Sequence, residues 1–208
     1  MSNVLFVKAN DRPADQAVSV QMYDAFLQAY KAANPDDQIT ELDLFNSELP
    51  YYNNAMMTGL FKQANGMDLD EQEKSLTATA NGYLDQFLAA DKVVFAFPLW
   101  NFTVPAQLTT YLFYLAQGGK TFKYTPEGPV GLAGDKKVAL LNARGGVYSA
   151  GPAEAIEMSM RYVRSIMNFF GITNLVEVIV EGHQQKPDEK DAILEEGRRR
   201  AAEAGASF

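Results

Sequence analysis

The sequence predicts an α/β fold: a three-layer sandwich in which helices cover both faces of a five-stranded parallel sheet. Short apolar runs alternate along the chain with longer segments whose apolar residues recur at helical spacing. The run 93–97 is apolar without exception, which is typical of a strand buried on both faces. A chain of 208 residues has room for five such strand and helix units, so we expect one domain, 1–208.

The N-terminal part of the chain predicts a strand, a helix and a second strand in turn. Residues 4–7 form an unbroken apolar run, which predicts a buried strand, and a polar loop follows them. From residue 17 onward, apolar side chains recur every four positions as far as Tyr30, which predicts the apolar face of a helix. Asn34-Pro35 ends this helix, and the apolar residues of 39–44 predict the second strand.

The middle of the chain contains the strongest strand signal. An irregular region begins at Pro50, and apolar residues spaced helically between 76 and 88 predict a second helix. The run 93–97 then predicts a central parallel strand. A further helix is expected to begin near Pro105 and to end at a glycine pair, because proline is favoured in a first turn and glycine just past a last one.

The C-terminal part completes the alternation. Residues 120–135 contain three glycines and two prolines, which predicts an inserted loop or hairpin. The remaining elements are a strand at 138–141, a helix over 156–170, a strand at 175–180 and a charged helix from Asp188 onward. Five strands suit a flavodoxin-like winding order better than a six-strand dinucleotide fold, although the pattern alone leaves the strand order open.

Composition excludes several classes of function. Acidic residues outnumber basic ones by 26 to 18, and no basic stripe is present, so we expect neither nucleic acid nor a membrane surface as a partner. The absence of cysteine and the single histidine exclude disulfides, iron–sulfur clusters and the usual zinc sites, and they favour a cytoplasmic location. No targeting segment is recognisable. Because few side chains here can carry out chemistry, a bound cofactor is the expected reactive centre.

Three loops that follow strands form the candidate site, because ligands of an open α/β sheet bind at the carboxyl ends of its strands. The loop 9–19 ends at a helix N-terminus, which favours a phosphate, and Ser19 could add a hydroxyl. An ordinary first-turn serine explains Ser19 equally well. The loop has neither a Walker nor a Gly-x-Gly-x-x-Gly pattern, so ATP and a Rossmann-bound dinucleotide lose support.

The second and third loops add aromatic rings and glycines. Trp100, Asn101 and Phe102 stand between two prolines and suit a flat heteroaromatic ligand, although a single tryptophan is more often a core residue. Gly145-Gly146 in the third loop lets the main chain approach a ligand closely or adopt a positive φ, and alone it would read as an ordinary turn. The three loops together indicate a binding site more strongly than any one of them.

These motifs resemble a known family, the FMN-dependent NADH azoreductases, also described as NADH–quinone oxidoreductases. The resemblance spans the chain and rests on Lys8-Ala9-Asn10-Asp11-Arg12-Pro13, Pro98-Leu99-Trp100-Asn101-Phe102, Thr121-Phe122-Lys123-Tyr124, Ala143-Arg144-Gly145-Gly146 and Phe170-Gly171-Ile172-Thr173. It implies a flavodoxin-like fold, bound FMN, and NADH or NADPH as co-substrate. It also implies a homodimer with FMN at the subunit interface and a ping-pong transfer of electrons to quinones and azo compounds, which cleaves azo bonds to amines.

The same resemblance implies site residues. For FMN it implies Asn10, Ala17, Val18 and Ser19 at the phosphate, Leu99, Trp100, Asn101 and Phe102 along the flavin ring, and Ala143, Arg144, Gly145 and Gly146 at its pyrimidine edge. For the substrate it implies Phe122, Tyr124, Tyr148 and Phe169. Some members carry serine at the positions of Asn10 and Ala143, so contact by side chain or by main chain stays open there. No catalytic side chain is implied, because the flavin performs the chemistry.

Other interpretations of the residues are weaker. His183 follows the last strand, so it could lie at the edge of the site and act as a general acid, but we expect an ordinary surface-loop histidine. Ser149 lacks the spacing of a hydrolase nucleophile, because Val147 stands where that motif requires glycine. The alternative function is a flavodoxin-like FMN electron carrier without direct NAD(P)H oxidation. A flavin-free interaction module is a further alternative.

Overall fold

A computed structural model describes residues 1–208. The central sheet has the strand order β2-β1-β3-β6-β7. Its strands are β1 (Asn3–Lys8), β2 (Gln38–Asp43), β3 (Lys92–Pro98), β6 (Lys137–Ala143) and β7 (Leu175–Val180). The helices are α1 (Val18–Ala33), α2 (Asn54–Ala64), α3 (Glu71–Ala89), α4 (Ala106–Leu115), α5 (Ser159–Phe169) and α6 (Lys190–Ala206), with short 3₁₀ turns η1 (Ala14–Gln16), η2 (Pro152–Ile156) and η3 (Pro187–Glu189).

All neighbouring strands of this sheet are parallel, and β1 has β2 on one side and β3 on the other. After β2 the chain therefore crosses over β1 to begin β3. The connection after β1 leads toward one edge of the sheet, and the connection after β3 leads toward the other edge. This confirms the predicted flavodoxin-like winding order. A crevice at the carboxyl ends of the strands is the usual binding place at such a switch point.

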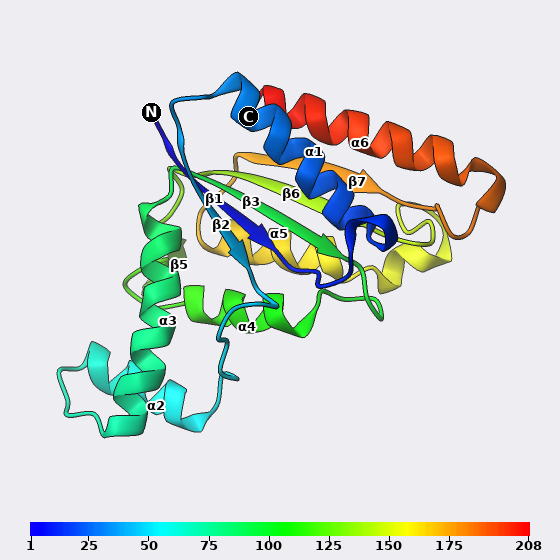
Figure 1. Cartoon of the computed structure of the whole chain (residues 1–208). Helices are drawn as coiled ribbons and strands as arrows, with labels where there is room; N and C mark the ends of the chain where they lie inside the picture. Colours follow the sequence, from blue (N-terminus) through cyan, green and yellow to red (C-terminus); the bar gives the residue numbers. More distant parts are fainter.

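Helices cover both faces of the sheet, with α1 and α6 on one face and α3, α4 and α5 on the other (Figure 1). The central strand β3 contributes to both cores. Its residues Val93, Phe95 and Phe97 pack into one apolar cluster and Val94 and Ala96 into the other. Because successive side chains of a strand point to opposite faces, a strand covered on both sides is apolar throughout, as the sequence predicted.

The structure differs from the sequence prediction in two places. The region after Pro50, expected to be irregular, contains helix α2, whose N-terminus is capped by the Asn53 side chain accepting from the Met56 N–H at 3.0 Å. Helix α5 begins only at Ser159, because residues 152–156 form a 3₁₀ turn. The expected insertion is confirmed as a hairpin of β4 (Phe122–Thr125) and β5 (Gly128–Gly131). No helix combines the length and the apolar character that crossing a membrane requires.

Candidate functional site

A cavity of about 370 Å³ lies at the carboxyl ends of β1, β3 and β6. Loops from all three strands contribute to it, and so does the segment that follows β7. It is lined by Asn10, Arg12, Gln16, Ala17, Val18, Ser19, Pro98, Leu99, Trp100, Asn101, Ala143, Gly145, His183 and Gln184. The structure thus brings most of the expected FMN residues to one place. Phe102, Arg144 and Gly146 are the expected residues that do not line it.

The N-terminus of α1 forms one wall of the cavity. Ala17 caps the helix without a side-chain bond, and the N–H groups of Val18 and Ser19 have no acceptor within the chain. Asn10 holds Ser19 in place, because its Nδ2 donates to the Ser19 Oγ at 2.9 Å while its Oδ1 accepts from the Arg12 N–H. Ser19 is 1 % exposed, so its free hydroxyl hydrogen is buried at a helix N-terminus. Free N–H groups and the helix dipole favour a phosphate here.

A tight turn of residues 100–103 forms the second wall. Trp100 and Thr103 bond to each other through both main-chain N–H groups, at 2.9 and 3.0 Å, and the two residues between them have φ angles of 46° and 71°. This is the geometry of a type I′ turn. The N–H groups of Asn101 and Phe102 therefore have no acceptor within the chain. The Trp100 ring packs edge-on against Phe45 at 6.0 Å.

The third wall is the glycine pair after β6. Neither Gly145 nor Gly146 has a positive φ. Of the two uses of a glycine pair, this one therefore serves the close approach of another group to the main chain. A β-carbon on Gly145 would lie 2.4 Å from Oε1 of Gln184, whose main-chain N–H donates to the Gly145 carbonyl. The N–H groups of both glycines have no acceptor within the chain.

Arg144 has a different position from the one that the sequence suggested. Its N–H donates to the Val180 carbonyl, and its guanidinium, 4 % exposed, lies between Asn142, Glu157 and Glu181. Burial raises the pKa of Glu157, but hydrogen bonds from Ser159 and Met160 and the charge of Arg144 outweigh it, so the pKa lies below its ordinary value. The bonds of Arg144 therefore support the glycine loop. Neither its guanidinium nor its main-chain N–H is free to bind a ligand.

Sequence reasoning gave a place at the edge of the site only as the less favoured alternative for His183, and it missed Gln184. His183 was expected on the surface, but it is only 9 % exposed and lines the cavity together with Gln184. Burial, and then the charge of Lys190, lower the pKa of His183 below its ordinary value. Because β7 neighbours β6 in the sheet, its carboxyl end lies beside the glycine loop. The adjacency of β7 and β6 predicts that the segment after β7 lies at the cavity, but this prediction requires the strand order, which the sequence pattern left open.

The four expected substrate residues lie in two places. Tyr148 follows the glycine loop, and its ring meets that of Phe102 edge-on at 6.5 Å. Phe122 instead packs with Phe169 at 4.4 Å and with Tyr124 at 5.5 Å, where the β4–β5 hairpin meets α5. None of these four side chains lines the cavity itself.

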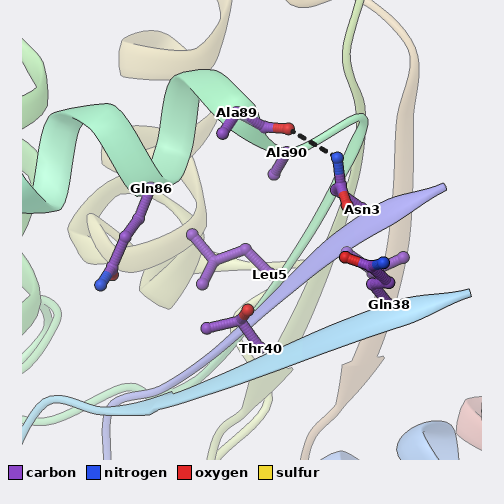
Figure 2. Close-up of a pocket in the computed structure, with 8 residues that line it drawn as sticks. Asn3, Leu5, Gln38, Thr40, Gln86, Ala89 and Ala90 are labelled. Carbon is purple, nitrogen blue, oxygen red and sulfur yellow. Dashed lines mark hydrogen bonds between the residues drawn. The ribbon is translucent and has the colours of Figure 1, made fainter.

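Another cavity, of about 250 Å³, lies at the opposite ends of the strands (Figure 2). It is bordered by the beginnings of β1 and β2 and by the end of α3. Its lining residues, among them Asn3, Gln38 and Gln86, carry no charge, and the Asn3 amide reaches the Ala89 carbonyl at 3.5 Å. With no charged side chain in its lining, this cavity is a poor candidate for an anionic ligand.

The chemistry of the cavity at the carboxyl ends of β1, β3 and β6 follows from the main-chain N–H groups that have no acceptor within the chain. Three pairs of main-chain N–H groups, at residues 18–19, 101–102 and 145–146, occur in the loops that build it. Fixed N–H groups stabilise negative charge without reorganising. Aromatic side chains and a helix N-terminus in the same place suit a planar ligand that carries a phosphate.

Comparisons with known proteins agree with this site. A sequence family described as having a flavodoxin-like fold matches residues 2–204. The FMN-dependent NADH:quinone oxidoreductase 3 of Bacillus cereus is 60 % identical over 208 residues, the whole of both chains. The FMN-dependent NADH:quinone oxidoreductase 1 of Listeria innocua is 58 % identical, again over the whole of both chains.

Solved structures give the same result. An azoreductase from Bacillus anthracis str. Sterne superposes with a TM-score of 0.98 at 59 % identity, and the match covers 100 % of both chains. An FMN-dependent NADH-azoreductase from Bacillus anthracis str. Ames Ancestor, solved in complex with FMN, superposes with a TM-score of 0.90 at 27 % identity over 100 % of this chain and 99 % of that one.

Proposed function

This chain belongs to the flavodoxin-like family of FMN-dependent NADH:quinone oxidoreductases and azoreductases, and from that membership we infer that it shares their activity. It is an FMN-dependent oxidoreductase that takes electrons from NADH and passes them to quinones and to azo compounds. Bound FMN supplies the redox chemistry, as the acceptor of a hydride from NADH and the donor of electrons to the second substrate.

The structural observation that supports this inference is the set of free main-chain N–H donors in the three loops that build one cavity. We propose that Val18 and Ser19 bind the FMN phosphate, because their N–H groups stand at the start of α1 without acceptors. The Asn101 and Phe102 N–H groups would face one edge of the flavin ring and those of Gly145 and Gly146 its pyrimidine edge. Such donors favour the negative charge that reduction places on the ring.

We also propose a homodimer that completes the site. Helices α2 and α4 present large apolar side chains to solvent, including Met57, Phe61 and Phe113, and a second copy of the chain would bury them. The aromatic cluster of Phe122, Tyr124 and Phe169 lies outside the cavity of its own chain, so it would contact substrate in the cavity of the other copy. Analytical ultracentrifugation tests this proposal, and a monomer at micromolar concentration would contradict it.

Electron transfer is proposed to follow a ping-pong order, with NADH and the acceptor occupying the same open face of the flavin in turn. Parallel lines in double-reciprocal plots at several acceptor concentrations support this order, and intersecting lines would contradict it. We propose the cytoplasm as the location, because a reducing compartment holds the NADH that the enzyme consumes.

The visible spectrum of the purified protein tests the function directly. We expect oxidised-flavin bands, which bleach when NADH is added without an acceptor and without oxygen, and which return when a quinone follows. Bands that persist with NADH but respond to a separate reductase would indicate the electron carrier instead. A colourless protein that gains no bands when FMN is added would contradict both.

Asn101 is the residue whose removal tests the flavin site. Asn101→Ala should weaken FMN binding or slow reduction by NADH by about tenfold, because alanine tolerates the positive φ of the turn less well and lacks the amide. FMN affinity is measured by fluorescence quenching and reduction by stopped flow. Unchanged affinity together with unchanged kinetics would remove Asn101 from the site.

A further inference from the structure

His183 is a buried polar residue without a protein partner. It follows β7, it is 9 % exposed, and its Nδ1 is buried without a hydrogen bond. A buried polar atom that finds no partner costs free energy, so such atoms are rare, and each suggests a missing ligand. His183 is also the only histidine of the chain.

The surroundings of His183 indicate an anion as that ligand. The residue lines the flavin cavity together with the phosphate-facing end of α1, Val18 and Ser19. It also lines an adjoining cavity of about 540 Å³, which Arg12 and Lys190 border as well. His183 and Arg12 thus line both cavities, free N–H groups border the first and Lys190 borders the second, and burial disfavours the charged form of the imidazole.

We propose that His183 is a further ligand of the FMN phosphate, which it binds as an imidazolium, so that FMN binding takes up a proton. This inference rests on the proposed function, because it assumes that FMN occupies the cavity. The dianionic phosphate supplies the negative charge that stabilises the protonated imidazole, and a turn of the ring would bring Nδ1, which solvent does not reach in this structure, to a phosphate oxygen.

The other charged groups around His183 do not replace it in this role. Arg12 and Lys190 line the adjoining cavity, Asp15 of η1 lies on the same wall, and Glu181, two residues earlier, bonds to Arg144, Tyr148 and Ser149. Histidine is the only side chain whose ordinary pKa gives a change of charge between about pH 5 and 8. The FMN phosphate itself titrates near about pH 6, so the experiment must separate the two groups.

The single histidine allows a direct measurement by NMR. With ¹³C-labelled histidine, the Cε1–H resonance reports the pKa of His183 alone. We expect a pKa below 6.5 in the apoprotein, a clearly higher one in the FMN complex and no such rise in the riboflavin complex, because riboflavin lacks the phosphate. Equal pKa values in the FMN and riboflavin complexes would overturn the proposal.

Binding measurements give a second, independent test. Because His183 takes up one proton, its contribution to FMN affinity should be greatest below the pKa of the free residue and should fall, by up to about tenfold per pH unit, as the pH rises toward the pKa of the complex. His183→Gln should lose this additional slope and retain only that of the phosphate. Arg12→Gln is the matched control: it removes a fixed charge of the same wall and should leave the slope unchanged.

The outcomes separate this proposal from the proposed function. If neither FMN nor riboflavin binds the apoprotein at any pH, the proposed function fails. If FMN binds but the wild-type protein and His183→Gln show the same pH dependence, FMN binding stands and the role of His183 is wrong. The NMR measurement uses the wild-type chain, so it stays decisive even if the variant does not fold.

Discussion

Asn101 and Phe102 adopt a backbone conformation that side chains ordinarily avoid. Both have positive φ angles, of 46° and 71°, and they are the only residues other than glycine that do. Asparagine tolerates this region, whereas for phenylalanine it is a true outlier that costs about 1–2 kcal/mol. The strain persists because the two main-chain bonds between Trp100 and Thr103 close the turn and the Met158 N–H donates to the Phe102 carbonyl. Strain of this kind is common at binding sites.

Replacing the strained residue should separate stability from function. Phe102→Gly removes the unfavourable φ while giving up a ring that is 46 % exposed, so we expect the apoprotein to gain about 1 kcal/mol in its free energy of unfolding by urea. Turnover with quinone should fall, because the ring is lost from the mouth of the site. Asn101→Gly is the control and should gain less. A destabilised Phe102→Gly apoprotein would contradict this account of strain.

Glu181 is the residue that ties the glycine loop to β7. Its carboxylate accepts from the N–H groups of Tyr148 and Ser149, at 2.9 and 3.1 Å, and from the Ser149 hydroxyl, and it faces Arg144 at 3.4 Å. Together with Gln185, which accepts from the Val147 N–H, Glu181 satisfies the main-chain donors of residues 147–149. The Gly145 and Gly146 N–H groups have no acceptor within the chain.

Glu181→Gln should therefore loosen the loop and leave Arg144 with one carboxylate fewer. We expect a loss of about 2 kcal/mol in the free energy of unfolding and weaker FMN binding. Gln185→Ala, which removes a single bond to the Val147 N–H, should cost about 1 kcal/mol and serves as the control. Urea unfolding and fluorescence titration measure the two effects. Equal losses for the two variants would contradict the central role of Glu181.

Among the elements, α6 packs a glycine directly against the main chain of α1. A β-carbon on Gly205 would lie 2.4 Å from the Phe26 carbonyl oxygen, which is main chain and cannot turn away. The glycine of α6 thus sets how near the two helices pack on their shared face of the sheet. Gly82 of α3, in contrast, has open space around it.

Two glycine-to-alanine substitutions should consequently change the stability of the protein in opposite directions. Gly205→Ala should destabilise the protein by about 2 kcal/mol, because the helices must move apart. Gly82→Ala should stabilise it by about 0.5–1 kcal/mol, because alanine is the better helix former and meets nothing there. Thermal unfolding compares the two, and a Gly205→Ala variant as stable as the wild type would show that the α1–α6 contact adapts.

At the scale of the whole molecule, carboxylates with lowered pKa values determine the response to acid. The hydrogen bond from Tyr30 holds the pKa of Asp37 below its ordinary 3.8, and the pKa of Glu157 lies below its ordinary 4.5. A group whose pKa is lowered by folding contributes stability above its unfolded value, and that stability is lost as the pH falls through the folded value.

The free energy of unfolding should therefore begin to fall below about pH 6.5, where the unfolded chain protonates His183 more readily than the folded one does, and should fall further below about pH 4.5. Glu157→Gln should be less stable at pH 7, because the buried Arg144 guanidinium then keeps only the Glu181 carboxylate as an ionic partner, but should lose less on acidification. Urea midpoints at pH 7 and pH 3.5 measure both. A variant that loses as much stability in acid as the wild type would exclude Glu157 from this response.

The sequence by itself determined the order of the main elements and the loops that carry the site. Apolar periodicity determines this order because it reflects which residues are buried. The pattern of buried residues is nearly the same in any chain that forms a parallel sheet covered by helices. Apolar periodicity did not predict α2, because the start of this helix depends on a side-chain cap at Asn53 within a polar, proline-containing stretch. Local signals of this kind are weak compared with apolar periodicity.

Only the tertiary structure decided the rest. The position of β7 beside β6 brings His183 and Gln184 into the cavity, and the carboxylates of the buried Glu157 and the half-buried Glu181 direct the Arg144 side chain away from it. These residues lie far from their partners along the chain. Their roles depend on which strands are neighbours and on which charges are buried together, and the spacing of residues along a sequence contains neither.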